Sequence, residues 1–389
     1  MKKVIGIILL GLVLPIAGCQ NLWADAGIIR IGINLSMTGK FGLVGQHAKN
    51  ATELVRKDIE AAGGIEVGGK KYQVEFIYDD NKSSPVEAAS VAVKLISKEN
   101  VLGIVGGLIS NQAIPMGQMA QAFATPMISP WSTSPITTLD RPYVFRSCFV
   151  FTIQGPALTK FAASEFKATK AAVLYDIVNA YPRGMAKNFK EAFEAQNGAG
   201  SVVAFEEFRT GDKDFSKQLA RIRDSGAGLI FTPQHYDEVP LIVRQAKSMG
   251  VTIPIVGSNS WAGGDLIGEC GTDCDGLFFG GNYAPGKATG LNKEFVDAYK
   301  IAYGENPDEP AALTWDAVRV LVEAIRRTGG FSGNLVSDRT LVKDTLTKIQ
   351  DFDGAAGKLS YNETGNPSKC TMIVKIENGV FTFHESICP

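Results

Sequence analysis

The stretch V-L-G-I-V-G-G-L-I-S-N-Q, from Val101 to Gln112, passes from an apolar run to glycine, serine and amides without one charged side chain. Its pattern predicts a strand, Val101 to Val105, and then a helix, Asn111 to Phe123. A second uncharged stretch, I-S-P-W-S-T-S-P from Ile128 to Pro135, follows the short apolar run Pro126 to Ser129. Both stretches therefore predict polar turns at the carboxyl ends of strands, where open α/β sheets bind ligands.

The chain around these stretches alternates between strand-like and helix-like patterns. The first part predicts strand 29–35, helix 45–62, strand 73–78, helix 85–98, and then the strand and helix named above. After Arg146 the pattern restarts with helix 154–166, strand 171–175, helix 182–196, strand 202–206, helix 215–224, strand 228–231, helix 238–249 and strand 253–256. Helices 293–303 and 311–327 and a β-rich end follow. This repetition predicts an α/β fold with two parallel-sheet units, each covered on both faces.

Composition limits the class of protein. The chain has 389 residues, 45% hydrophobic and 20% charged, which is typical of a globular protein and long enough for two domains. The formal net charge is -1 and no basic block stands out, so we expect no nucleic-acid partner.

The N-terminus has the features of an export signal. Lys2 and Lys3 precede an apolar core from Val4 to Leu14, which is too short to span a bilayer, and residues 1–18 are predicted to be removed. The cleavage region Ile16-Ala17-Gly18-Cys19 resembles the lipobox of bacterial lipoproteins, which implies that Cys19 becomes a lipidated N-terminus. The alternative is an ordinary secretory signal with a chance cysteine, and either interpretation takes the mature chain out of the cytoplasm.

The remaining cysteines predict disulfides in an exported protein. Cys370 and Cys388 flank two strand-like runs, 371–376 and 380–384, whose Asn-Gly turn predicts a hairpin that brings the cysteines opposite each other. Cys270 and Cys274 bracket a short loop that suits a local disulfide or half of a metal site, although no histidine cluster supports a metal. Cys148 lies in an apolar stretch and is expected to be a buried core residue.

The two uncharged stretches could hold an anion. Ser110 lies where a helix N-cap is expected, and free backbone N–H groups at a helix start attract a carboxylate without any arginine. Ser132, Thr133 and Ser134 could hold the other side of the same group. The competing interpretation is that Ser110 only caps its helix and that the second stretch is an ordinary loop.

A series of short segments resembles the leucine/isoleucine/valine-binding family, the type I periplasmic substrate-binding proteins of ABC importers. These segments run in family order over nearly the whole mature chain: 32–39, 62–65, 78–80, 105–107, 128–130, 145–146, 179–181, 213–215, 307–308 and 315–317. The resemblance implies two lobes joined by three crossovers that close on a ligand. It places a linker at 19–27, the first lobe at 28–149 and 283–362, and the second lobe at 150–282 and 363–389.

The resemblance also implies a set of ligand contacts. The ligand carboxylate meets Ser110, with Leu108 and Ile109 beside it, while the loop at Trp131, Ser132 and Thr133 offers a carbonyl and a hydroxyl. The second lobe contributes Tyr181, and the same comparison brings His235, Tyr236 and Asn259 to the cleft. Trp131 and Trp261 lie at predicted strand ends and are expected to line the cleft, whereas Trp315 fits a helical core pattern.

Asn259 leaves the ligand class open. Members that bind α-amino acids commonly have an acid in the corresponding Gly-Gly-Asp-Gly-Trp-like segment, but this chain has Gly257-Ser258-Asn259-Ser260-Trp261. The expected ligand is a branched-chain or other apolar amino acid, held by Asn259, the loop carbonyl at Trp131 and another acid, because this is the commoner cargo that the resemblance implies and an amide oxygen can still accept from an ammonium. The alternative is an aromatic or aliphatic carboxylate stacked on Tyr181, Trp131 and Trp261.

Other classes of protein fit the residues less well. The glycines near Val105 lack dinucleotide-binding and phosphate-loop spacing, and the three histidines are widely spread, so an enzyme is not expected. A transcription regulator of similar fold would need a DNA-binding segment. A sensory receptor without transport would use the same cleft. We therefore expect a monomeric, lipid-anchored solute-binding component of an ABC importer, with permease subunits as partners, facing the periplasm or cell exterior and needing no cofactor or metal.

Overall fold

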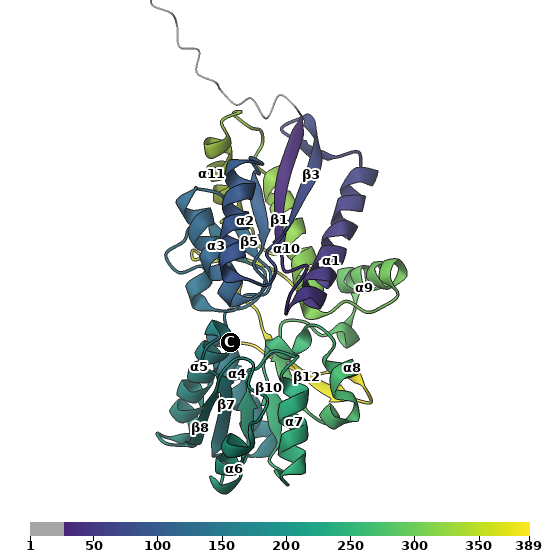
Figure 1. Ribbon diagram of the computed structural model, residues 1–389. Coiled ribbons are helices and arrows are strands. Elements are labelled where there is room, and N and C mark those ends of the chain that lie inside the picture. Colours follow the sequence, from purple (N-terminus) through teal and green to yellow (C-terminus); the bar gives the residue numbers. More distant parts are fainter. Residues whose placement is uncertain (1–26) are drawn as a thin grey trace, which may run out of the picture.

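A computed structural model describes residues 27–389 of the chain. The predicted signal segment 1–18, the lipidation site Cys19 and the linker up to residue 26 lie outside the described residues. The described chain forms two lobes stacked end to end, with the purple and blue N-terminal elements in the upper lobe of Figure 1 and the teal elements in the lower one.

The first lobe is built on a sheet with the strand order β2-β3-β1-β4-β5-β6. The pairs of β1 with β3 and β4 are parallel, and so are those of β4 with β5 and β5 with β6, whereas β2 pairs with β3 antiparallel. The strands are β1 Ile28–Leu35, β2 Ile65–Val67, β3 Lys70–Asp80, β4 Gly103–Gly106, β5 Met127–Ser129 and β6 Val144–Arg146.

Helices cover both faces of this sheet, as the apolar strands require. The central strand β1 is buried at every position from Ile31 to Leu35, and because successive side chains alternate between the faces of a sheet, both of its faces need a cover. Helices α1 and α10 pack together on one side, and α2 and α3 on the other (Figure 1). The helices of this lobe are α1 Gly42–Ala61, α2 Pro85–Ser97, α3 Ser110–Ala122, α9 Gly290–Tyr303, α10 Glu309–Arg326 and α11 Leu335–Leu346.

The second lobe has the strand order β13-β12-β11-β10-β9-β7-β8. The neighbouring strands β8, β7, β9, β10 and β11 are parallel. An antiparallel hairpin of β12 and β13 is added at the β11 edge. The strands are β7 Ala171–Asp176, β8 Val202–Phe208, β9 Ile230–Thr232, β10 Ile255–Gly257, β11 Phe278–Gly281, β12 Thr371–Glu377 and β13 Val380–Ile387. The helices are α4 Phe151–Phe166, α5 Ala180–Asn197, α6 Ser216–Asp224, α7 Val239–Ser248 and α8 Leu266–Cys270.

The chain passes between the lobes after β6, after β11 and before β12, and within the described residues these are the three crossovers. The predicted α/β fold of two doubly wound, mainly parallel lobes is thus confirmed. The sequence patterns missed β2, β6, β11, α8 and α11. The missed strands are three or four residues long, too short for a period to be read, and α11 has a weakly amphipathic sequence.

Both predicted disulfides are present. Cys370 and Cys388 join the base of the β12–β13 hairpin with Cα atoms 4.1 Å apart. Cys270 and Cys274 form a local bridge at the end of α8, so their thiols are not free to bind a metal. Cys148 is buried with a free thiol, as predicted.

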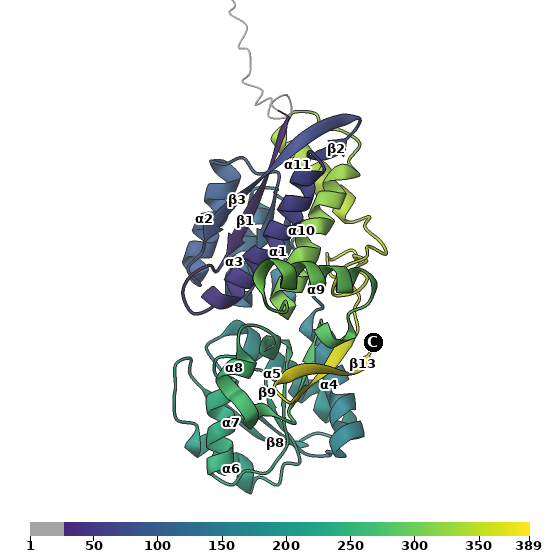
Figure 2. The same cartoon turned by 90° about the vertical axis from the view of Figure 1, so that its right-hand side faces the viewer.

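The lobes touch across the cleft through polar contacts. The Lys40 ammonium of the first lobe lies 2.9 Å from a carboxylate oxygen of Glu238 and 3.3 Å from one of Asp237 in the second lobe. The Asp308 carboxylate accepts a hydrogen bond from the backbone N–H of Gly264 at 3.2 Å. Figure 2 shows α9 alongside the junction of the two lobes. These contacts indicate a closed arrangement.

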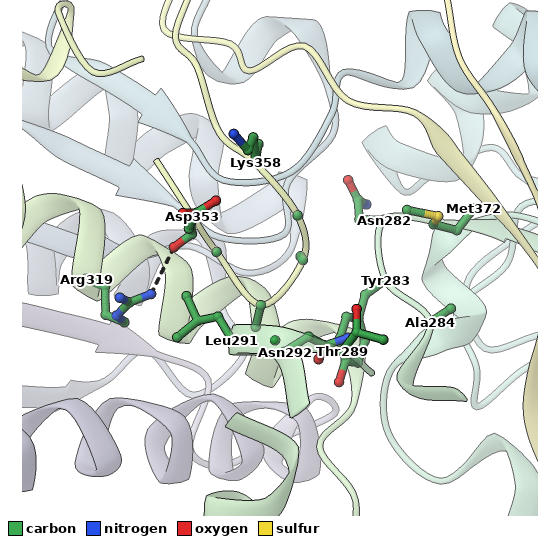
Figure 3. A pocket seen from close by; sticks show the side chains of 15 residues that line it. Asn282, Tyr283, Ala284, Thr289, Leu291, Asn292, Arg319, Asp353, Lys358 and Met372 are labelled. Atoms are coloured by element: carbon green, nitrogen blue, oxygen red, sulfur yellow. Dashed lines mark hydrogen bonds between the residues drawn. The ribbon is translucent and has the colours of Figure 1, made fainter. Parts of the chain in front are cut away.

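A cavity of about 660 Å³ lies beside the crossovers. In Figure 3, Arg319 and Asp353 lie on one side, joined by a hydrogen bond from the guanidinium to the Asp353 carbonyl at 3.0 Å, and Asn282 and Met372 lie on the other. The crossovers therefore border open space here.

Candidate ligand-binding site

A small cavity lies between the lobes where strand ends of both sheets converge. It is lined by eight residues: Leu108, Ile109, Ser110, Trp131, Tyr181, His235, Asn259 and Ser260. The free space is about 10 Å³, room for about one water molecule. A ligand the size of an amino acid therefore enters only when the lobes separate or the lining side chains move.

Each lining segment follows the carboxyl end of a strand. Leu108, Ile109 and Ser110 follow β4, and Trp131 follows β5. In the second lobe Tyr181 lies beyond β7 and His235 beyond β9, while Asn259 and Ser260 follow β10. This is where parallel α/β sheets bind ligands. Two roomier cavities, of about 660 and 770 Å³, contain none of the predicted contacts.

The turn after β4 depends on glycine. Gly106 and Gly107 have φ of 154° and 70°, and a Cβ on Gly106 would lie 2.0 Å from the carbonyl oxygen of Asn34. Only glycine permits this close approach. The turn brings the start of α3 to the cavity.

Helix α3 begins one residue earlier than predicted, and this corrects the assigned role of Ser110. Ile109 is the N-cap and no side chain caps the helix, while Ser110 is its first helical residue. The Ser110 hydroxyl is 2.9 Å from the Ser132 hydroxyl instead of bonding to its own helix. Within the described chain, the backbone N–H groups of Ser110 and Asn111 donate no hydrogen bond. The helix start therefore presents free donors, the chemistry that suits an anion.

A hydroxyl chain supports this end of the cavity. Ser132 is 2.7 Å from the Thr137 hydroxyl, so its own hydroxyl stands one layer behind Ser110. The buried Arg146 guanidinium donates to the carbonyls of Ser132 and Ser134, at 2.6 and 2.9 Å, and holds the loop in place. The Thr133 hydroxyl is buried with no hydrogen-bond partner among the described residues.

The second lobe contributes a second helix start. Asn179 caps α5 by accepting the Tyr181 backbone N–H at 3.3 Å, and Asn111 of the first lobe accepts the Ala180 N–H at 3.1 Å. The Tyr181 hydroxyl donates to Asn259 Oδ1 at 2.6 Å and lies 2.8 Å from Ser258. Burial raises the pKa of Tyr181, so it remains a neutral donor.

His235 is neutral at this site. Burial, aided by the positive charge of Lys40, lowers the pKa of His235 to about 3. Its Nε2 lies 3.3 Å from the Asn179 amide nitrogen, whose orientation is set because the amide oxygen already accepts from Tyr181. Nε2 is therefore the acceptor, and the proton belongs on Nδ1, which has no partner among the described residues.

Four predicted contacts do not line the cavity. Ser132 and Thr133 are not among its lining residues, and the Ser132 hydroxyl bonds to those of Ser110 and Thr137. Tyr236 is 3% exposed and its ring covers Gly264, where an added Cβ would lie 2.3 Å from it. Trp261 is fully buried against Gly257, and its indole N–H donates to the Thr232 carbonyl at 3.2 Å. Because these glycines lack a Cβ, they leave room for the two aromatic rings. Trp315 packs against Phe295, with ring centroids 4.9 Å apart, as expected of a core residue.

Sequence reasoning missed two residues, Ser260 and Glu309. Ser260 lies beside Asn259 in the same uncharged segment, and that composition was its only signal. Glu309 opens α10, and its carboxylate accepts the Trp131 indole N–H at 2.9 Å. A glutamate in a first helical turn is an ordinary helix start, so nothing local marks it.

The site has hydrogen-bond donors and aromatic walls. Its serines lie next to one another and not beside a titrating base, since His235 is already neutral with an unprotonated Nε2 bonded to Asn179. Among residues 27–389 no group of three metal-ligating side chains comes together, and no helix there has the length and apolarity to span a membrane. The geometry is that of a binding site for a small polar-headed ligand.

Comparison with known proteins agrees with this geometry. Residues 28–380 match the family described as periplasmic binding protein. The leucine-specific-binding protein of Salmonella typhimurium is 27% identical over 388 residues, which cover 99% of this chain and 98% of that protein.

Two solved structures extend the comparison. A leucine-binding protein from Thermotoga maritima has a TM-score of 0.84 and 31% identity, over 93% of this chain and 99% of that one. A solute-binding protein from R. palustris in complex with benzoate has a TM-score of 0.81 over 93% and 97% of the two chains, but at 22% identity it shows the fold alone. The chain therefore belongs to the periplasmic binding protein family, the extracytoplasmic solute-binding proteins of ABC transporters.

Proposed function

We propose that this protein binds an apolar α-amino acid, such as leucine, isoleucine or valine, in the cavity between its lobes and delivers it to the permease subunits of an ABC importer. The observation that carries the proposal is the pair of helix starts facing one cavity, with unpaired N–H groups at Ser110 and Asn111 on one side. These donors suit a carboxylate, and Leu108, Ile109 and Trp131 suit an apolar side chain.

The relatives support the same ligand class, since two of them are named for leucine. We further propose that Cys19 carries a lipid that anchors the protein to a membrane, that the protein acts as a monomer, and that it releases its ligand chemically unchanged. Mass spectrometry of the ligand after incubation with pure protein tests the last point, because any product would contradict it.

A second candidate ligand class is a carboxylate without an amino group. It is favoured by one observation: none of the residues that line the cavity is acidic. Calorimetry separates the two classes by comparing leucine and phenylalanine with 4-methylpentanoate and 3-phenylpropanoate. We expect the amino acids to bind more tightly. Tighter binding of the des-amino acids would assign the site to simple carboxylates.

A further inference from the structure

Glu309 is a buried carboxylate at the point where both lobes and a crossover meet. Its side chain is the first of α10 and the residue is 1% exposed. One carboxylate oxygen accepts from the Asn282 side-chain amide at 2.8 Å, and the other accepts from the Asn282 backbone N–H at 2.7 Å. Together with the Trp131 indole N–H, these donors hold the carboxylate in one orientation.

This carboxylate stands directly behind the cavity wall. The Trp131 indole N–H donates to it at 2.9 Å, and the nearby Asn259 side chain helps to lower its pKa; both residues line the cavity. The Asn259 amide in turn accepts from the Tyr181 hydroxyl, and the negative charge of Glu309 helps to raise the pKa of that hydroxyl. Three lining residues thus lie within the electrostatic reach of one buried anion.

Among residues 27–389, no cationic side chain is paired with Glu309. Within the described residues it forms no ion pair with a lysine, arginine or histidine. The buried Lys369 interacts with it only at longer range and donates instead to the Ala356 carbonyl at 3.2 Å. A buried carboxylate without a countercharge is costly, and burial raises the pKa of Glu309 to about 7. A positive group placed in the cavity would offset that cost.

We propose that Glu309 supplies the negative charge that selects a ligand bearing an ammonium group. It acts as a positioning and specificity-determining residue through Asn259 and Trp131, without contacting the ligand. The inference rests on the proposed amino-acid function and adds the residue that distinguishes an amino acid from a des-amino acid. Helix α3 then attracts the ligand carboxylate at one end of the cavity, while Glu309 attracts the ammonium at the other.

The test measures the ratio of dissociation constants for 4-methylpentanoate and leucine by calorimetry on the full chain. In Glu309→Gln, the amide keeps the shape and a hydrogen-bond acceptor but removes the charge. We expect the ratio to fall by about tenfold or more, the scale of one charge-assisted interaction, with leucine weakened and 4-methylpentanoate unchanged or tighter.

A rescue and a matched control exclude a merely structural role. The double variant Asn259→Asp, Glu309→Gln moves the charge to the cavity wall, and we expect it to regain preference for leucine. Asp308→Asn removes the neighbouring acid, whose carboxylate contacts His47 and Gly264, and should change both affinities by the same factor.

The two ways of failing are distinguishable. If Glu309→Gln weakens leucine and 4-methylpentanoate equally, and the double variant restores nothing, the assignment to Glu309 is wrong while the amino-acid function stands. If the parent protein binds 4-methylpentanoate more tightly than leucine, the proposed ligand class itself is overturned.

Discussion

At the residue scale, we expect ligand binding to depend on hydroxyls that make few hydrogen bonds within the fold. Ser110 bonds only to another serine hydroxyl, and the Thr133 hydroxyl is buried without a partner. We predict that Ser110→Ala weakens ligand binding by about 1 to 3 kcal/mol, because a charged acceptor loses a donor in a buried site, and that Thr133→Ala does the same, because we expect its unpaired hydroxyl to turn towards the ligand when the lining side chains move. Isothermal calorimetry measures the loss. Ser201→Ala is the matched control and should bind like the parent, since Ser201 is a buried serine without a hydroxyl partner just before β8, away from the cavity. If Ser110→Ala and Thr133→Ala also bind like the parent, the two residues do not belong to the site.

At the element scale, α1 is tied to the start of α10 through a histidine. His47 Nδ1 lies 2.9 Å from Asp308 and Nε2 lies 3.5 Å from Glu305, and the side chain is 11% exposed. Burial opposes protonation, but the hydrogen bond and charge of Asp308, with Glu305 and Asp265, raise the pKa of His47 above its ordinary value. Protonated His47 therefore stabilises the folded state.

The raised pKa of His47 predicts how stability depends on pH. The contribution is fully present below the unfolded-state pKa of about 6.5 and is lost as pH rises through the higher folded-state pKa. We expect the melting temperature of the parent to exceed that of His47→Gln at pH 5, and the difference to shrink towards pH 9. Thermal unfolding of both proteins across this range checks the prediction, and a pH-independent difference would contradict it.

At the scale of the whole molecule, the closed arrangement is held by charges on opposite lobes. Lys40 pairs with Glu238 and Asp237, and their attraction raises the pKa of Lys40 despite its burial. We predict that Lys40→Met lowers ligand affinity by roughly tenfold, about 1.4 kcal/mol, because fewer molecules occupy the binding-competent closed state. Without ligand, X-ray scattering should show a larger radius of gyration for Lys40→Met than for the parent protein. Arg221→Met, which removes a pair with Glu206 inside the second lobe, should change neither quantity.

The sequence by itself determined the order of most strands and helices, because their periods are local and each spans several turns or residues. It also determined the hairpin and its disulfide, because an Asn-Gly turn sets the register of the strands that it joins. The uncharged turns at Ser110 and Trp131 could also be identified from the sequence, because each directly follows a predicted strand.

Only the tertiary structure decided which of these residues face the cavity. The Trp261 ring packs over Gly257, four residues before it, and the Tyr236 ring packs over Gly264, far along the chain; only the folded backbone shows that these glycines leave room for the rings. Glu309 is about fifty residues beyond Asn259 in sequence, and only the packing of α10 against the crossover brings its charge behind the cavity wall. Local interactions decide which element a segment forms, whereas the site is assembled from contacts between segments distant in sequence, and these depend on how whole elements pack.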